Sequence, residues 1–152
     1  AESVGPQFDR KLRPDAFGDT VRFLGLKRHE ELRDYIQSFS VCIIPFRITP
    51  VTVAANPVKA YEYLGAGKPV VSTALPECQG MAPYVDAAAS REAFIRKVAE
   101  RLDEPGDGAA RISYALEHTW ERRAREINAL LRSLPERKER TRSRRAIEFS
   151  PD

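Results

Sequence analysis

The apolar positions of the chain form short continuous runs and helical stripes, with little strict alternation. Residues 41–45 (VCIIP) and 69–72 (PVVS) are two such runs. Runs of this length without alternation are typical of parallel strands that are covered on both faces. Because helix punctuation lies between them, the stretch 41–73 predicts a strand, a loop, a helix and a second strand.

The punctuation of that helix is clear at both ends. Asn56 is a residue type that caps helices, and Pro57 suits the first helical position, where its missing N–H is not needed. Gly65 and Gly67 suit the end of a helix, because glycine tolerates the left-handed backbone found there. We therefore expect a helix from Pro57 to the neighbourhood of Gly65.

The elements on either side follow from the same patterns. Residues 21–24 predict a short strand, and residues 30–39 predict a helix with its apolar positions at i, i+3, i+4 and i+7. Val4-Gly5-Pro6 resembles the end of a strand whose beginning is missing. Residues 84–86 predict a last strand. Three helices are then expected, capped in turn by Ser90, Asp107 and Thr119.

The last of these helices carries an apolar stripe whose members are Trp120, Ala124, Ile127, Leu131 and Leu134. Core packing is the simplest interpretation of the stripe, and a docking face is the alternative. Together the elements predict an α/β fold, a Rossmann-like parallel sheet flanked by helices. We expect one N-terminally truncated domain over residues 1–134, apparently lacking its first strand, and a charged, disordered tail over residues 135–152.

The edge where the strands end is the expected place for a ligand. In parallel α/β sheets, ligands bind outside the carboxyl ends of the strands. In this chain that edge consists of the loop 46–56 and the start of the helix that follows it. A helix start offers unpaired N–H groups and a partial positive charge, so it suits an anion such as phosphate.

Lys59 and Glu62 place two charged groups near this helix start. Lys59 lies in the expected first turn, and Glu62 follows it at i+3, so the two side chains share a face. Side chains on a helix lean towards its N-terminus, which brings the Glu62 carboxylate towards the ligand edge. There it can accept hydrogen bonds from a ribose diol. The alternative is a surface Lys–Glu pair that stabilises the helix by only about 0.3–0.5 kcal/mol.

Composition narrows the functional classes. The 152 residues suit one domain, and a formal net charge of +3 from 25 basic and 22 acidic residues gives no strong bias towards nucleic acid or membranes. Cys42 and Cys78 match no metal spacing, so we expect no metal site and a buried thiol at Cys42. No run approaches the roughly 18 apolar residues of a membrane span and no signal peptide is visible, which favours a cytoplasmic setting.

The tail 135–152 is polar and carries charges of both signs. A solvated extension is the simplest interpretation. The alternative is a weak attraction to anionic lipid, of about 1 kcal/mol per basic residue near such a surface, which would hold a larger enzyme at the membrane.

Three motifs, VRFLG, HEELRDYIQSFSVCIIPF and NPVKAYEYLGAGKPVVST, occur in this order and are followed by TWERRAREINALL. In order and spacing they resemble the C-terminal, donor-binding domain of GT-B-fold glycosyltransferases, in the branch called glycosyl transferases group 1. The resemblance covers about residues 4–134. It implies that an N-terminal acceptor-binding domain is missing here. We therefore expect the isolated chain to be inactive. Because the missing first strand would leave a sheet edge unpaired, we also expect the chain to associate with itself or with a separate N-terminal half.

The resemblance also implies a donor site. In that family an acidic residue in the position of Glu62 binds the ribose of a nucleotide sugar. The preceding loop, which includes Thr49, and the helix start formed by Asn56, Pro57, Val58 and Lys59 correspond to the segment that holds the diphosphate. The nucleotide-diphospho-sugar is a substrate, and no further cofactor and no metal are implied. The catalytic residues stay unassigned.

One position leaves the sugar-binding half of this site open. Many retaining members of the family carry another glutamate eight positions before the ribose-binding one, and this chain has Ala54 there. Glu77, just past the second apolar run, also belongs to the ligand edge. It is either a site residue or a solvated loop carboxylate.

Three functions are consistent with these patterns. The first is the donor-binding part of a hexosyltransferase-type glycosyltransferase. The second is a related GT-B enzyme, such as a nucleotide-sugar epimerase. The third is a non-catalytic interaction module that has kept the fold, which Ala54 and the truncated first strand favour.

Overall fold

The computed structural model describes residues 1–4 and 14–134, and the structural statements below concern these residues. They belong to two compact units, Ala1–His118 and a second unit that begins at Thr119, and each unit is described by itself. The expected tail over residues 135–152 lies outside the described residues, so the domain boundary at residue 134 stays a prediction.

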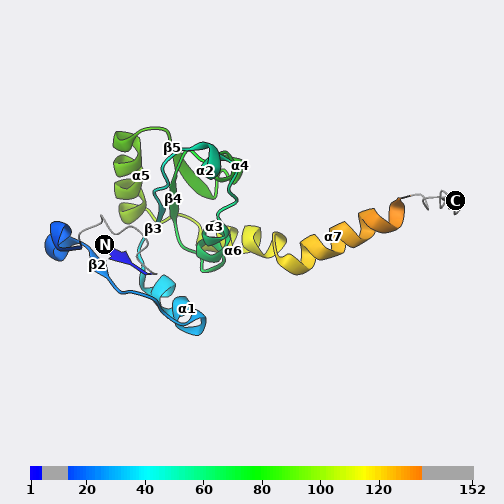
Figure 1. Cartoon of the computed structure of the whole chain (residues 1–152), viewed down its shortest axis with the longest axis horizontal. Coiled ribbons are helices and arrows are strands. Elements are labelled where there is room, and N and C mark those ends of the chain that lie inside the picture. Colours follow the sequence, from blue (N-terminus) through cyan, green and yellow to red (C-terminus); the bar gives the residue numbers. More distant parts are fainter. Residues whose placement is uncertain (5–13, 135–152) are drawn as a thin grey trace, which may run out of the picture. The chain divides into compact units, whose positions relative to one another are not determined.

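The first unit contains two parallel sheets (Figure 1). β1 (Glu2–Ser3) pairs with β2 (Arg22–Phe23) in a two-stranded sheet. β3 (Cys42–Ile44), β4 (Val70–Thr73) and β5 (Val85–Ala88) form a three-stranded sheet in the order β3-β4-β5. The predicted α/β fold with parallel strands and flanking helices is therefore confirmed. The first strand is present as two residues, which end before the Val4-Gly5-Pro6 segment that suggested it.

The helices lie close to their predicted positions. They are η1 (Pro14–Thr20, a 3-10 helix), α1 (His29–Ser38), α2 (Pro50–Val53), α3 (Val58–Gly65), α4 (Pro76–Gly80), α5 (Arg91–Asp103), α6 (Gly108–Glu117) and α7 (Trp120–Ser133). The three predicted caps are confirmed. Ser90 accepts from the N–H of Ala93, Asp107 from that of Ala110, and Thr119 from that of Arg122.

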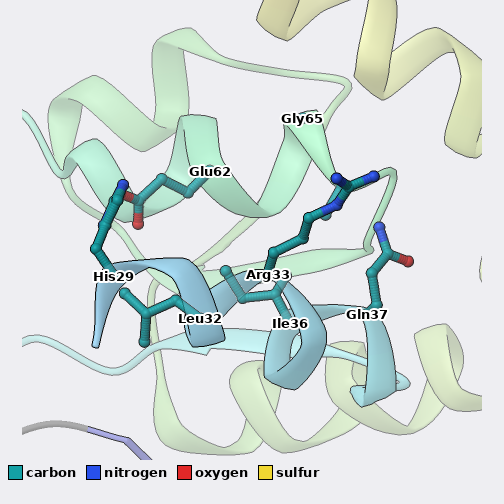
Figure 2. Close-up of a pocket in the computed structure, with 8 residues that line it drawn as sticks. His29, Leu32, Arg33, Ile36, Gln37, Glu62 and Gly65 are labelled. Atoms are coloured by element: carbon teal, nitrogen blue, oxygen red, sulfur yellow. The ribbon is translucent and has the colours of Figure 1, made fainter. Parts of the chain in front are cut away.

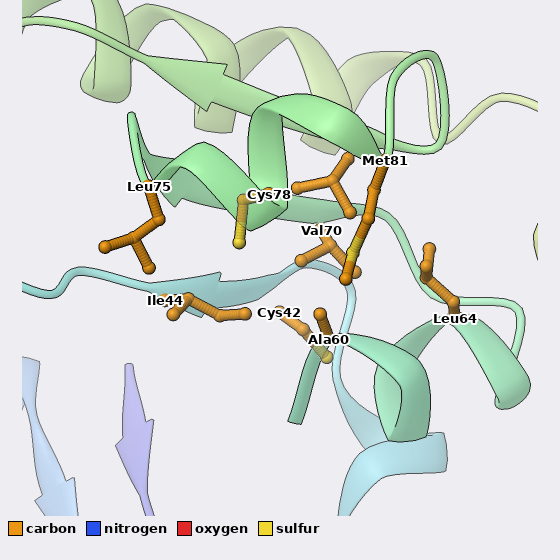
Figure 3. Packing of buried hydrophobic residues seen from close by; sticks show 9 residues of the cluster. Cys42, Ile44, Ala60, Leu64, Val70, Leu75, Cys78 and Met81 are labelled. Carbon is orange, nitrogen blue, oxygen red and sulfur yellow. The ribbon is translucent and has the colours of Figure 1, made fainter. Parts of the chain in front are cut away.

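The core of the first unit lies between the three-stranded sheet and the helices α3 and α4 (Figure 3). Its fully buried members include Ile44, Leu64, Val70, Leu75 and Met81. Cys42 is also buried, as predicted, and burial raises the pKa of its thiol to about 12.

One expectation about β3 is wrong. The continuous apolar run predicted cover on both faces, but the side chain of Ile43 is 43% exposed. Successive side chains of a strand point to opposite faces, so Ile43 lies on the face away from Cys42 and Ile44. On the sheet face that carries Ile43, α5 packs against β4 and β5. The strand β3 is at the edge of this sheet.

The start of α3 also differs from the prediction. Pro57 is the N-cap, and no side chain caps the helix, so the predicted Asn56 cap is wrong. The backbone of Pro57 is itself extended, with φ −75° and ψ 97°, so the helix begins at Val58 and Asn56 lies one residue too early to cap it. The end of α3 agrees with the prediction: Gly67 has a φ of 74°, its N–H donates to Leu64, and the N–H of Lys68 donates to Tyr63. These two bonds are those of a Schellman motif.

The second unit contains α7. Its apolar stripe is exposed, with Trp120 72% exposed and Ile127, Leu131 and Leu134 all above half. The described part of this unit does not cover the stripe, so core packing against another part of the chain and a docking face both stay predictions. None of the described helices combines the length and the apolar character needed to cross a membrane.

Candidate functional site

The loop that follows β3 contacts the end of β4 at the carboxyl edge of the three-stranded sheet. The hydroxyl of Thr73, the last residue of β4, donates to the carbonyl of Phe46 at 2.9 Å. The loop after Phe46 then folds into α2, where Thr49 and Thr52 form a capping box. The hydroxyl of Thr49 accepts the N–H of Thr52 at 3.2 Å. Thr49 thus lies at the predicted edge, with its side chain engaged in shaping the loop.

The start of α3 has backbone donors that no side chain caps. The N–H of Ala60 donates to the carbonyl of Pro57 at 2.9 Å, as in a tightened first turn. The helix has no side-chain cap, so the N–H groups of Val58 and Lys59 are left for solvent or a ligand. The side chains of Asn56, Val58 and Lys59 are exposed and that of Pro57 is buried. The segment 56–59 therefore has the form of an anion-binding helix start.

Glu62 lines a pocket of about 400 Å³ between α1 and α3. Figure 2 shows its carboxylate directed towards the side chain of His29, the first residue of α1. The predicted lean towards the ligand edge is consistent with this placement. Lys59 is not among the residues that line the pocket, so the structure does not bring the two charged side chains into one cavity.

Three polar residues of α1 also line the pocket, and the sequence pattern did not indicate them. His29, Arg33 and Gln37 lie four residues apart along one face of the helix. Leu32 and Ile36 supply the apolar part of the wall. The four-residue spacing was visible in the sequence, but α1 and α3 are distant in the chain, so their proximity was not.

Glu77 lies on another side of α3. It is in the first turn of α4, directly after the carboxyl end of β4, and its side chain is half-buried. The hydroxyl of Tyr61 donates to its Oε1 at 3.3 Å. The Tyr61 ring is 5.9 Å from that of His118, which stacks at 4.1 Å on Tyr114 of α6. Glu77 is thus held from α3 instead of being a free loop carboxylate.

Tyr63, the residue after Glu62, has a shifted pKa. Burial raises the pKa of Tyr63 to about 12, with further contributions from the Cys42 thiol and the Glu62 carboxylate. The Tyr63 hydroxyl is therefore neutral near pH 7. No group of three or more metal-ligating side chains gathers within the described part of the chain. Backbone N–H groups at a helix start and carboxylates are groups of the kind that bind anions and accept hydroxyl hydrogen bonds.

Comparisons with known proteins identify the family of this chain. The putative teichuronic acid biosynthesis glycosyltransferase TuaH of Bacillus subtilis (strain 168) is 36% identical over 84 residues, which cover 47% of this chain and 21% of the relative. The match thus spans only about a fifth of that relative's length. No solved structure matches the chain. The sequence profile described as glycosyl transferases group 1 matches residues 3–104, from β1 through α5 and including Lys59, Glu62 and Glu77. Because this match covers more than half of the chain, the chain belongs to the glycosyl transferases group 1 family.

Proposed function

We propose that this domain binds the nucleotide-diphospho-sugar donor of a glycosyltransferase. The observation that carries the proposal is the position of Glu62 in the pocket between α1 and α3, one turn after an uncapped helix start. The Glu62 carboxylate accepts the two ribose hydroxyls. The diphosphate lies at the helix start formed by residues 56–59, with the loop at Thr49 beside it.

The same helix start accounts for a role in sugar transfer. Negative charge grows on the leaving diphosphate as the bond between the sugar and oxygen breaks. The N–H groups of Val58 and Lys59 are fixed before the reaction, so they stabilise that charge without rearranging. The Lys59 ammonium adds a full positive charge nearby. The donor is a substrate in this proposal, and the acceptor is left open.

One observation favours a second candidate, a non-catalytic interaction module. Ala54 caps the end of α2 and supplies no carboxylate where many retaining relatives have one. A module that had lost its chemistry would keep the fold without nucleotide affinity, so binding separates the two candidates.

The test is titration of the chain with uridine, guanosine and adenosine diphosphates by calorimetry. We expect saturable binding of at least one of them. Glu62→Ala should weaken it roughly ten- to a hundredfold, because hydrogen bonds to a charged group are lost. The same variant should leave the affinity for the 2′,3′-dideoxy diphosphate almost unchanged, since that ligand has no diol.

Lys59→Ala is the matched comparison. It should weaken the ordinary and the dideoxy diphosphate alike and reduce the salt dependence of binding, because it removes a charge that faces the phosphates. If neither substitution changes the affinity of a chain that binds nucleotide, the assignment of this site is wrong. If no diphosphate binds, the interaction module is the better description.

A further inference from the structure

Two carboxylates, those of Glu62 and Glu77, lie on different sides of α3. Glu62 reaches the pocket shared with α1, whereas the preceding residue, Tyr61, contacts Glu77 at the start of α4. Consecutive helical residues are separated by about 100° around the axis, so Tyr61 and Glu62 leave α3 in different directions. The start of α3, which no side chain caps, adjoins both of these sides.

The Glu77 carboxylate is positioned and still able to accept hydrogen bonds. One oxygen accepts the Tyr61 hydroxyl at 3.3 Å. An ionised carboxylate has about four acceptor positions, so this bond leaves capacity for other donors. Tyr61 is itself held by its ring contact with His118, whose Nδ1 lies 2.7 Å from the carbonyl of Tyr114. The arrangement fixes a carboxylate at the edge where the sheet presents its ligand.

A donor substrate has three parts in a fixed order: nucleoside, diphosphate and sugar. With the ribose at Glu62 and the diphosphate at the start of α3, the sugar continues past α3, on the side away from α1. Sugar hydroxyls are hydrogen-bond donors that need acceptors. Ala54 provides none with its side chain, whereas Glu77 stands at the same edge on the side of α4.

We propose that Glu77 binds hydroxyl groups of the donor sugar, and that Tyr61 is the positioning residue that holds its carboxylate. This inference rests on the proposed function, because it needs a nucleotide in the site. It assigns the selectivity for the sugar to Glu77 and leaves the affinity for the nucleotide to Glu62 and the helix start.

The experiment compares each nucleoside diphosphate with its sugar conjugate: UDP with UDP-glucose, GDP with GDP-mannose, and ADP with ADP-glucose. The native chain should bind one sugar conjugate more tightly than the matching diphosphate. Glu77→Gln should reduce that preference by roughly tenfold or more, because a charged acceptor is lost, and should change diphosphate affinity less than twofold. Tyr61→Phe should reduce the preference by a smaller factor, also without changing diphosphate affinity.

Two comparisons separate this role from a structural one. Glu62→Gln should weaken diphosphate and sugar conjugate by the same factor, because both contain the ribose. Glu104→Gln, at an exposed position after α5, should change neither. Melting temperatures of all variants report on folding.

Each remaining outcome is decisive. If the native chain binds a diphosphate and its sugar conjugates equally, or if Glu77→Gln weakens both equally, the inference about Glu77 is overturned while the proposed function stands. If the native chain binds none of the six ligands, both are overturned.

Discussion

At the scale of single residues, the pKa of Asp86 is set by two opposing effects. Burial by itself raises the pKa of this carboxyl, but the hydrogen bonds and charge of Arg101, aided by Lys97, hold it below its ordinary value. The Nε of Arg101 is 2.5 Å from Oδ2, and the Nζ of Lys97 is 3.6 Å from Oδ1. The cluster joins β5 to α5 and lies apart from the proposed donor site.

We expect this cluster to make stability depend on pH in the acid range. Since the folded-state pKa lies below the ordinary value of 3.8, the stabilisation is complete above that value and is lost as the pH falls through the lower folded pKa. Asp86→Asn should therefore lower stability near neutral pH and flatten its decline in acid. Urea denaturation at several pH values measures both effects.

Asp103→Asn, at an exposed position at the end of α5, is the control and should leave the acid decline intact. If the stability of Asp86→Asn falls with decreasing pH as steeply as that of the native chain, other carboxylates cause the decline.

Residues of the candidate site were predictable to the extent that they share one helix. The i+3 spacing of Lys59 and Glu62 identified a charged helix face, and Glu62 indeed lines a pocket. His29 and Arg33 were not predicted as site residues because their place in the pocket depends on α1 lying beside α3. Spacing along the chain carries no signal for that kind of proximity.

At the scale of elements, the turn after α3 depends on close approach of backbone segments. Gly67 has a positive φ of 74°, and a Cβ at this position would lie 3.3 Å from Ile112 Cδ1 and 3.4 Å from the carbonyl oxygen of Gly108. The Gly67 carbonyl also accepts a hydrogen bond at 3.1 Å from Arg111, a buried guanidinium that donates as well to Pro105. The turn thereby joins α3 to α6.

Gly67→Ala should destabilise the first unit by more than about 1 kcal/mol, because alanine is strained at this φ and its methyl group is crowded from α6. Gly80→Ala is a suitable comparison, since Gly80 ends α4 without a positive φ, and a Cβ added there would meet nothing within 4 Å. Chemical denaturation of both variants provides the measurement. Equal stability of the two would mean that the turn relaxes without cost.

The elements also show which structural features sequence patterns can specify. The caps Ser90, Asp107 and Thr119 were predictable because a cap and the N–H that it accepts are at most three residues apart. The predicted Asn56 cap was wrong because Pro57 has an extended ψ of 97° and so lies outside the helix, which the sequence pattern did not indicate. The expectation that Ile43 is covered was wrong for another reason, because its cover depends on which helix packs over the edge strand.

At the scale of the whole molecule, the main unexplained feature is apolar surface. The stripe on α7 exposes several large side chains, of which Trp120 is the most exposed at 72%. Large apolar patches on a protein surface mark contacts with other molecules. Burying one large apolar side chain contributes about 1.5–3 kcal/mol, so a few of them suffice to hold two helices together.

We expect the chain to associate with itself through this stripe, in a concentration-dependent manner. Light scattering over a range of protein concentrations measures the association. Trp120 is the only tryptophan of the chain, so a blue shift of its emission with rising concentration reports burial of the stripe itself.

Ile127→Asn combined with Leu131→Asn should keep the chain monomeric and its emission constant, because both changes put amides on the apolar face. Ile43→Lys, which alters the exposed face of β3, should leave association through α7 intact. A monomeric native chain with invariant emission would contradict the expectation, whereas monomers formed only by Ile43→Lys would transfer the interface to the sheet.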